Sequence, residues 1–535
     1  MLRRSISHLF PRSLPLLALV LGVGAPRGLH LRRPPTDPPP VPREFRAAWV
    51  TPILDRGLRD WPSSPNLTTE EQQMELRATL ARAADAGLNA IILHVRLAGD
   101  AFYPTTYAPW SAFLTGQSGV GPSPAYDPLA FAIEEAHARG LQVHAWFNPF
   151  RAMLPNFAGQ AAASHVTKKH PEWIRKYGSQ TWIDPGDPAA RKYVLDTFLD
   201  VVKRYDVDGI HIDDYFYPYQ EVEMYTRRVK RRRIRERRVI PFPDNKTWAK
   251  YGKARGFTDR DAWRRANIDD FVQQLYKSVK AIRPSVVVGI SPFGIWRPGS
   301  PPGITGLDSY SEIYADSKRW LAEGWLDYLT PQLYWRVGGE QDRFRQLDAW
   351  WRSVNPQQRY VWPGLYTSHV YAGNDAWPMG EIAREVTTLR EARIGSADAP
   401  GEVHFRLAAL FANNDTLAQT LAPLYRERAL VPAFPWLGAD VPAQPIVTVT
   451  TDSAAIAAGV TSHPASFTVI PGDESPVRWW LIQTRGRDGV WTTSLRPVGA
   501  GKELAAAFGT NDPDEVAVSA ISPTGIASSP TIVMP

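Results

Sequence analysis

The chain has 535 residues, of which 44% are hydrophobic and 21% charged, so it is a globular protein too long for one simple core. Its formal net charge is +7, and the arginine-rich run at 227–238 alone exceeds this value, so the rest of the chain is close to neutral. Because cysteine is absent, disulfides, thiolate nucleophiles, cysteine-based zinc or iron–sulfur sites and lipid-modified cysteine anchors are excluded.

Residues 1–26 have the layout of a secretory signal. Arg3 and Arg4 precede an apolar segment at 14–23 that ends on small residues. This segment is too short to cross a bilayer, which takes about 20 residues. We therefore expect an exported protein of the periplasm or cell envelope, with an uncleaved N-terminal anchor near the membrane as the alternative. Residues 27–42 are rich in proline and predict an extended linker.

From residue 43 to 436, strand-like and helix-like segments alternate. The first three helices are expected at 70–86, 128–139 and 189–205. Eight strands are expected at 46–51, 90–96, 142–148, 209–214, 286–291, 328–335, 360–366 and 403–410. This alternation predicts the α/β class and a closed (β/α)8 TIM barrel rather than an open doubly wound sheet. No glycine-rich phosphate-binding turn follows any strand, so we expect no nucleotide or other cofactor.

The sequence changes character near residue 437. Between 440 and 535, short β-rich runs are separated by Gly, Asp, Asn and Pro turns. They predict a C-terminal all-β sandwich of the fibronectin type III style.

The most informative segment is 209–218 (GIHIDDYFYP), an apolar strand that ends in Asp213, Asp214 and Tyr215. Carboxyl groups are costly at the end of a buried strand unless they are paired, hydrogen-bonded or functional, and neighbouring aromatic rings suit sugars. A helix N-cap is the structural alternative for either aspartate. The pair in its aromatic setting favours carbohydrate chemistry.

Other predicted strands also end in polar and aromatic residues. In a barrel of this type, such side chains converge on one rim, where substrate binds. The expected substrate-binding residues are Arg96, His144, Trp146, Asn148, His211, Tyr215, Gln332, Tyr334, Trp335 and Tyr366.

Glycoside hydrolysis normally needs one carboxyl group to protonate the leaving oxygen and a second to act as nucleophile or base. We expect Asp213 to be the nucleophile or base, and Asp214 to orient substrate or bind His211. Asp100 leads the candidates for proton donor, because Gly99 and nearby aromatic residues indicate an apolar strand-end loop. The other candidates are Asp308, Glu312 and Asp316.

Two other classes of function stay open at this point. A barrel with the same aromatic cleft could bind carbohydrate without turnover. A metal-dependent deacetylase or other hydrolase could use His94, His144, His211 and Asp213 as ligands, although the sequence has no His-x-His or His-Glu-x-x-His spacing.

Several motifs resemble the bacterial glycosyl-hydrolase-like family 10. They run in order at 46–50, 95–96, 99–103, 109–111, 114–116, 136–137, 144–149, 206–218, 289–297, 327–328 and 331–335. The resemblance implies a barrel glycoside hydrolase of the bacterial envelope that cuts peptidoglycan glycan strands, with a fibronectin-like module after the barrel. A polysaccharide partner is expected, and membrane proximity only through the N-terminal segment.

Three features depart from the family pattern. His94 stands where the family commonly carries Gln, and the expected eighth strand is unusually basic at His404 and Arg406. The third is the arginine run at 227–238, which is either a solvated face or an attractor of an anionic polymer. Nucleic acid is not expected as a partner, because the run lacks interleaved aromatic residues and a recognisable binding fold.

Overall fold

The computed structural model describes residues 36–155, 160–229, 232–451, 464–499, 503–507 and 513–534. Residues Pro38–Pro535 belong to one compact unit. The predicted signal or anchor at 1–26 and most of the predicted linker lie outside the described residues. Among the described helices, none is both long and apolar enough to cross a membrane.

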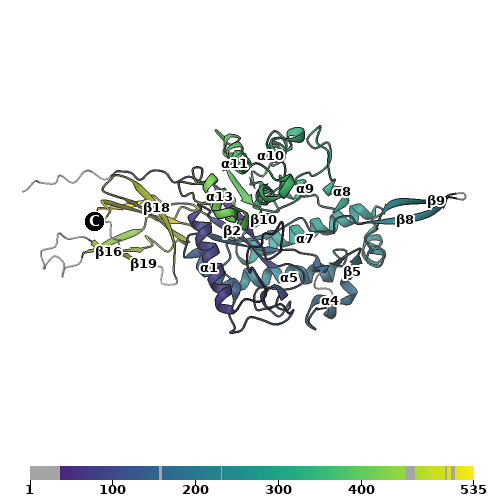
Figure 1. The fold of residues 1–535 in the computed structure, drawn as a ribbon. Coiled ribbons are helices and arrows are strands. Elements are labelled where there is room, and N and C mark those ends of the chain that lie inside the picture. Colours follow the sequence, from purple (N-terminus) through teal and green to yellow (C-terminus); the bar gives the residue numbers. More distant parts are fainter. Residues whose placement is uncertain are drawn as a thin grey trace, which may run out of the picture. The chain divides into compact units, whose positions relative to one another are not determined.

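A parallel sheet forms the centre of this compact unit (Figure 1). Its strand order is β12-β11-β10-β7-β3-β2-β1-β14-β13. The bounds are β1 (Phe45–Val50), β2 (Ala90–Arg96), β3 (Gln142–Phe147), β7 (Gly209–Ile212), β10 (Val287–Ile290), β11 (Tyr328–Leu329), β12 (Tyr360–Val361), β13 (Gly364–Leu365) and β14 (Gly401–His404). Strands β1, β2 and β7 are buried along their whole length, as expected for parallel strands covered on both faces.

The sheet closes through one interrupted strand. Only Trp362 and Pro363 separate β12 from β13; β12 pairs with β11, and β13 pairs with β14. Counting β12 and β13 as one pass gives eight strands around the barrel. The prediction of a (β/α)8 barrel is confirmed.

The helices begin at residues that satisfy their free N–H groups. Thr68 and Glu71 form a capping box at α1 (Thr69–Asp85). Asp127, Asp187 and Asp259 cap α3 (Pro128–His137), α5 (Pro188–Arg204) and α7 (Arg260–Ile282). The remaining α-helices are α2 (Ala112–Thr115), α4 (Val166–Lys169), α6 (Asn245–Thr247), α8 (Ser309–Glu312), α9 (Ser317–Ala322), α10 (Arg343–Ser353), α11 (Glu381–Glu391), α12 (Leu407–Leu410) and α13 (Ala412–Leu421).

The last barrel strand differs from its predicted extent. It ends at His404, and the apolar residues that follow form helix α12 instead. The fully buried Arg406 explains the break, because its side chain forms an ion pair with Asp60 at 2.7 Å and donates to the carbonyl of Ile53 at 2.5 Å. The other carboxylate oxygen of Asp60 accepts the amide of Ala408 at 2.6 Å, which fixes the start of the helix.

Two insertions were not predicted. After β3, strands β4 (Arg151–Met153), β5 (Ile174–Tyr177) and β6 (Gln180–Ile183) form a small sheet in the order β4-β6-β5. After β7, strands β8 (Val222–Val229) and β9 (Arg232–Val239) form a two-stranded ribbon. Both insertions follow strands that end at the predicted rim.

The C-terminal part is all-β, as predicted. One antiparallel sheet contains β15 (Ile446–Thr451), β16 (Pro464–Ile470) and β19 (Leu504–Ala507). The other contains β17 (Trp479–Arg485), β18 (Trp491–Pro497), β20 (Glu515–Ile521) and β21 (Thr531–Val533). Residues of β16, β17 and β20 share one buried core that includes Val469, Trp480 and Val518, so the two sheets form a sandwich.

Candidate active site

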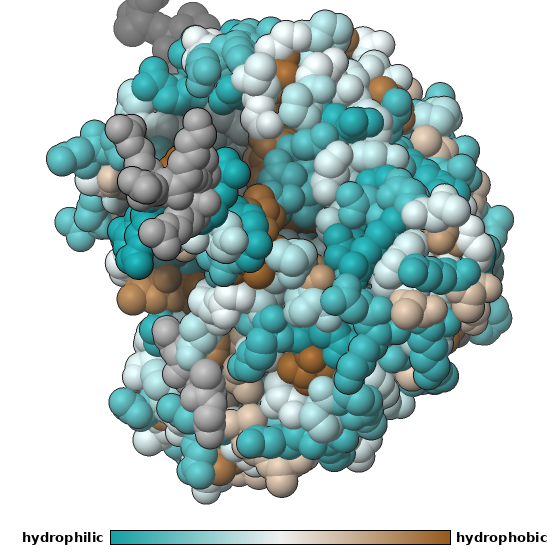
Figure 2. All heavy atoms as spheres, turned by 90° about the vertical axis from the view of Figure 1, so that its right-hand side faces the viewer, coloured by the Kyte–Doolittle hydropathy of each residue, from teal (hydrophilic) through white to brown (hydrophobic). Residues whose placement is uncertain are grey.

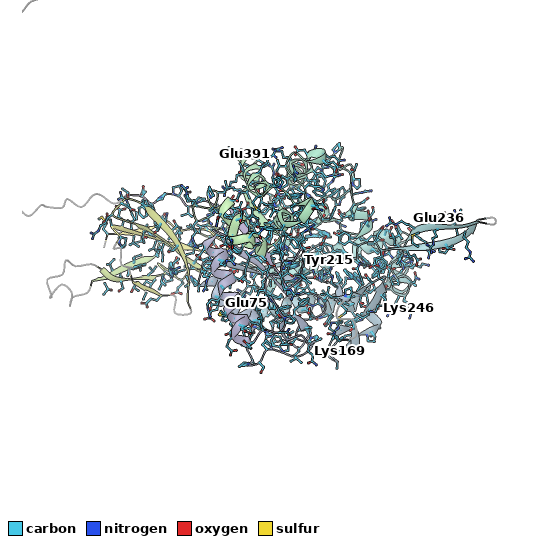
Figure 3. The ribbon with its side chains drawn as sticks, in the orientation of Figure 1. Glu75, Lys169, Tyr215, Glu236, Lys246 and Glu391 are labelled. Atoms are coloured by element: carbon cyan, nitrogen blue, oxygen red, sulfur yellow. The ribbon has the colours of Figure 1, made fainter. Side chains whose placement is uncertain are left out.

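A cavity of about 350 Å³ opens at the carboxyl ends of the barrel strands, where TIM-barrel enzymes place their active sites. Figure 3 labels one of its residues, Tyr215, within the barrel. The cavity is lined by Trp49, Thr51, Ile53, Asp55, His94, Trp146, Asn148, Arg151, Asp213, Asp214, Tyr215, Tyr219, Ser291, Phe293, Gln332, Tyr334, Phe405 and Arg406.

Asp213 and Asp214 stand side by side at the end of β7. The four residues of β7 are buried, and the two aspartates that follow are only 4% and 5% exposed. The side-chain amide of Asn148 donates to Oδ2 of Asp213, and the hydroxyl of Tyr219 donates to Oδ2 of Asp214. Each carboxyl group therefore has its own hydrogen-bond donor.

The two carboxyl groups do not titrate normally. Burial and the neighbouring charge of Asp214 raise the pKa of Asp213 to about 8. Burial also raises the pKa of Asp214 above its usual range. Because the two groups interact, the pair keeps one proton near neutral pH, as a site for acid–base chemistry requires.

Arg151 supplies positive charge beside this pair. Its guanidinium lies 3.7 Å from the ring centroid of Tyr215, and its Nη1 donates to Oδ1 of Asn148 at 3.5 Å. Its charge opposes the rise in the pKa of Asp213, so it stabilises the anion that remains once a proton has left the pair.

Aromatic rings form much of the cavity wall. Trp146 stacks on His94 with ring centroids 3.7 Å apart, and the Nδ1 of that histidine lies 3.0 Å from the hydroxyl of Thr51. Tyr334 stacks on Tyr366 at 4.5 Å. Flat apolar faces next to carboxyl groups and amides are suited to sugar rings and their hydroxyls.

The structure places seven of the predicted site residues in the lining. These are Asp213, Asp214, Trp146, Asn148, Tyr215, Gln332 and Tyr334. The other six lie outside it: Arg96, Asp100, His144, His211, Trp335 and Tyr366. Two of these stand just behind the lining, Tyr366 against Tyr334 and Trp335 edge-on to Phe293 at 6.1 Å.

His144 and His211, predicted to bind substrate, lie in the barrel interior and outside the cavity lining. Their Nδ1 atoms lie 2.8 and 3.0 Å from the hydroxyl of Tyr328, and both histidines are fully buried. Nε2 of His211 accepts the indole N–H of Trp49 at 3.2 Å, so it does not bind Asp214. Burial lowers the pKa of His144 to about 4 and that of His211 well below its usual value, which keeps both rings neutral.

Asp100, predicted as the proton donor, lies outside the cavity lining and is hydrogen-bonded within its own loop. Its carboxylate accepts the backbone amides of Leu97 and Ala98 at 3.0 and 2.9 Å and the hydroxyl of Ser111 at 2.5 Å. These bonds close the loop after β2 on itself and leave the carboxylate outside the cavity.

Arg96 also lies outside the cavity lining. It is fully buried and donates to the carbonyls of Asn148 and Pro149 at 2.9 and 3.2 Å. It therefore fixes the backbone that carries Asn148, which in turn bonds Asp213.

The histidines proposed as metal ligands are not gathered around one point. His94 stacks on Trp146, whereas His144 and His211 bond Tyr328. Across the described ranges, no group of three or more His, Asp or Glu side chains is arranged to hold a metal ion.

Sequence reasoning missed several polar residues of the cavity, among them Asp55, Arg151 and Tyr219. Asp55 follows β1 and is the third carboxyl group of the lining; its Oδ2 accepts the hydroxyl of Ser368 at 3.3 Å. Arg151 and Tyr219 come from insertions after β3 and β7. Their positions directly after predicted strands were the available signal.

Comparison with known proteins identifies the family of this chain. The family model described as glycosyl hydrolase-like 10 matches residues 44–377. "Glycosyl hydrolase YngK" of Bacillus subtilis (strain 168) is 36% identical over 443 residues, which cover 79% of this chain and 80% of that protein. "Glycosyl hydrolase DigH" of Escherichia coli (strain K12) is 34% identical over 356 residues, 62% of this chain and 75% of that protein.

Among solved structures, the glycoside hydrolase domain of PgaB (BpsB) from Bordetella bronchiseptica covers 73% of this chain and 100% of its own. The TM-score is 0.46 and the sequence identity 15%. The family model spans more than half of the chain, and the match to YngK extends over most of both proteins. The chain therefore belongs to the glycosyl hydrolase-like 10 family and is a glycoside hydrolase.

Proposed function

We propose that this glycoside hydrolase cleaves the glycan strands of peptidoglycan in the cell envelope, through a two-carboxylate mechanism in the cavity of the barrel. The observation that carries the proposal is the buried pair Asp213 and Asp214, which lies in the cavity beside an aromatic wall. The predicted secretory layout of residues 1–26 supports an envelope substrate, because an exported enzyme meets this polymer outside the cytoplasm.

In this mechanism Asp213 is the proton donor. A pKa of about 8 keeps it protonated at neutral pH, so it can protonate the glycosidic oxygen as the bond breaks. This role differs from the nucleophile or base expected from sequence, and the difference comes from burial and from the charge of Asp214.

Asp214 is then the anionic partner. Tyr219 donates to its Oδ2, a bond to the charged form that favours ionisation. As an anion, Asp214 stabilises the positive charge that develops at the anomeric carbon and takes the proton of the attacking water. Arg151 compensates the negative charge that Asp213 acquires on losing its proton.

The test is release of new reducing ends from peptidoglycan that an amidase has stripped of its peptides, with and without a chelator. We expect release in both conditions from the wild-type protein and at least about a hundredfold less from Asp213→Asn. Glycan binding without release would support a non-catalytic carbohydrate-binding barrel instead. Release abolished by the chelator would support a metal-dependent hydrolase.

The matched control is Asp55→Asn, which makes the same chemical change in the same cavity but outside the coupled pair. We expect its rate to stay within about tenfold of the wild type, because general acid catalysis is worth about 10²–10⁴-fold and is assigned to Asp213. If Asp55→Asn lost as much activity as Asp213→Asn, Asp55 rather than Asp214 would be the second carboxyl group of the mechanism.

A further inference from the structure

The β8–β9 ribbon combines strong positive charge with exposed apolar side chains. Its two strands contain seven arginines and two glutamates. In Figures 1 and 3 it extends away from the barrel, with Glu236 on the ribbon and Tyr215 in the barrel. Figure 2 looks onto this side, which is largely hydrophilic with scattered hydrophobic residues.

On one face of the ribbon, both glutamates form ion pairs with arginines of the ribbon. The cross-strand pairs Glu223–Arg238 and Tyr225–Glu236 lie on this face, together with Arg227. Arg238 forms an ion pair with Glu223 at 2.5 Å, and Arg227 forms one with Glu236 at 2.9 Å. Both glutamates of the ribbon therefore already form ion pairs and do not neutralise its other arginines.

The opposite face, which we call the basic face, keeps its charge. Arg233, Arg235 and Arg237 alternate along β9, so their side chains point to the same side and repeat at about 6.6–6.8 Å. All three are exposed, and none forms an ion pair with a described residue.

The basic face also exposes apolar side chains. Met224 lies opposite Arg237, and Val222 lies opposite Val239. Their exposed fractions are 60% for Met224 and 45% for each valine. Water solvates arginines well but not these side chains, so the basic face matches a surface that is both anionic and apolar.

The root of the ribbon is fixed to the hairpin of β5 and β6. Glu221, just before β8, accepts the hydroxyl of Ser179 at 2.9 Å and the side-chain amide of Gln180 at 3.1 Å. Its own amide donates to the hydroxyl of Tyr177 at 3.1 Å. Seven residues separate Asp214 from β8, so the ribbon continues the segment that follows the proposed catalytic pair.

We propose that the basic face of the β8–β9 ribbon docks on an anionic lipid bilayer, with its arginines at the lipid phosphates and Met224, Val222 and Val239 at the apolar boundary. The chemistry is that of interfacial elements, which combine arginines with apolar side chains. A soluble polyanion would use the arginines but would leave the apolar residues in water. Docking would hold the cavity close to the membrane surface.

The test is sedimentation of the full-length protein with vesicles of phosphatidylcholine alone or with 30% phosphatidylglycerol, about the composition of an anionic leaflet. We expect binding to the anionic vesicles only. The triple variant Arg233→Ser, Arg235→Ser, Arg237→Ser should lose about a hundredfold in affinity, since each arginine contributes about tenfold or less near such a surface. The charge-matched control Arg345→Ser, Arg384→Ser, Arg487→Ser should bind like the wild type.

A second variant separates a bilayer from a soluble polymer. Met224→Ser with Val222→Ser keeps all the charge, so it should weaken vesicle binding and leave binding to polyphosphate unchanged. The proposal is overturned if the wild type ignores anionic vesicles, if both triple variants lose binding equally, or if the apolar variant binds vesicles normally. Glycan hydrolysis in solution should be the same for all variants, which keeps this test independent of the proposed function.

Discussion

Asp213 differs from an ordinary surface aspartate because it is buried beside a second carboxyl group. Burial is the larger cause of its raised pKa, and the charge of Asp214 is the next. In the mechanism that we propose, one side chain of the pair acts as an acid and its neighbour as a base.

This arrangement predicts the pH dependence of hydrolysis. Asp213 must be protonated, so kcat/KM should fall as the pH rises through about 8. Asp214 must be ionised, so the rate should also fall as the pH drops through its own raised pKa. In Asp214→Asn, the residual activity should lose its alkaline limb at a lower pH than the wild type, because a charge that raises the pKa of Asp213 is gone. If the alkaline limb of Asp214→Asn lay at the same pH as that of the wild type, the charge of Asp214 would not raise the pKa of Asp213.

The role of Asp213 as acid predicts which substrates its variant can still cleave. Asp213→Asn should lose at least about a hundredfold on a sugar leaving group and less than about tenfold on an aryl glycoside whose phenol needs no proton. Steady-state kinetics on the two substrates measures this. Equal losses on both would indicate the nucleophile or base role that the sequence suggested.

The same residues show what a sequence can and cannot predict about a site. The run GIHIDD identified Asp213 and Asp214 because a buried strand that ends in two carboxyl groups needs a special reason. His144 and His211 fit the same pattern yet lie deeper, because alternation along a strand indicates the face but not the depth of a side chain. Nothing in the sequence around Asp100 distinguishes a carboxylate that closes a loop from one that takes part in catalysis.

At the scale of elements, the barrel interior depends on small residues in the strands. A Cβ atom added to Gly289 would lie 2.0 Å from Cζ of Tyr328, and one added to Gly209 would lie 2.7 Å from Nδ1 of His144. These glycines make room for the layer in which the hydroxyl of Tyr328 lies between His144 and His211.

Gly289→Ala should therefore destabilise the protein by about 3 kcal/mol, the upper end of the usual cost of overpacking. Tyr328 would have to move and break its contacts with both histidines. Gly380→Ala is the control, because nothing lies within 4 Å of the added Cβ and the expected change is within about 0.5 kcal/mol. Urea denaturation measures the stability of both variants. Equal denaturation midpoints for Gly289→Ala and Gly380→Ala would contradict the close packing of Tyr328 against Gly289.

The regular elements were largely predictable, whereas the insertions were not. Apolar runs bounded by glycine located β2 and α1 within one or two residues, because tertiary packing and local pattern agree there. The run at 403–410 was ambiguous: it contains both the end of β14 and helix α12, and the buried contacts of Arg406 decide where one ends. The sequence did not predict the strands of the β8–β9 ribbon. These strands are exposed and rich in arginine, so they lack the alternation of apolar and polar residues that marks a half-buried strand.

At the scale of the molecule, Arg478 connects the loop before β17 to the segment that leads into β7. It forms ion pairs with Asp206 at 2.5 Å and Asp208 at 2.8 Å. Burial of Asp208 opposes its ionisation, but Arg478 and His137 outweigh this effect and lower its pKa below the usual range.

Arg478→Ala should cost about 3 kcal/mol at neutral pH, since it leaves a buried carboxylate with fewer partners. The pKa of Asp208 is depressed on folding, so its contribution to stability is present above its unfolded pKa of about 3.9 and is lost as the pH falls. The difference between variant and wild type should therefore shrink below about pH 4. Thermal unfolding from pH 3 to 7 checks this, with the exposed Arg487→Ala as the control. A difference independent of pH would assign the effect to packing alone.

We propose that Asp213 and Asp214 together add water across a glycosidic bond of an envelope glycan. The most direct test of this proposal is digestion of amidase-treated peptidoglycan in H₂¹⁸O, with mass spectrometry of the fragments. We predict one ¹⁸O atom at each new reducing end with the wild type and Asp55→Asn, and almost none with Asp213→Asn or Asp214→Asn. Fragments without the label, or full labelling by the Asp213→Asn protein, would contradict the account.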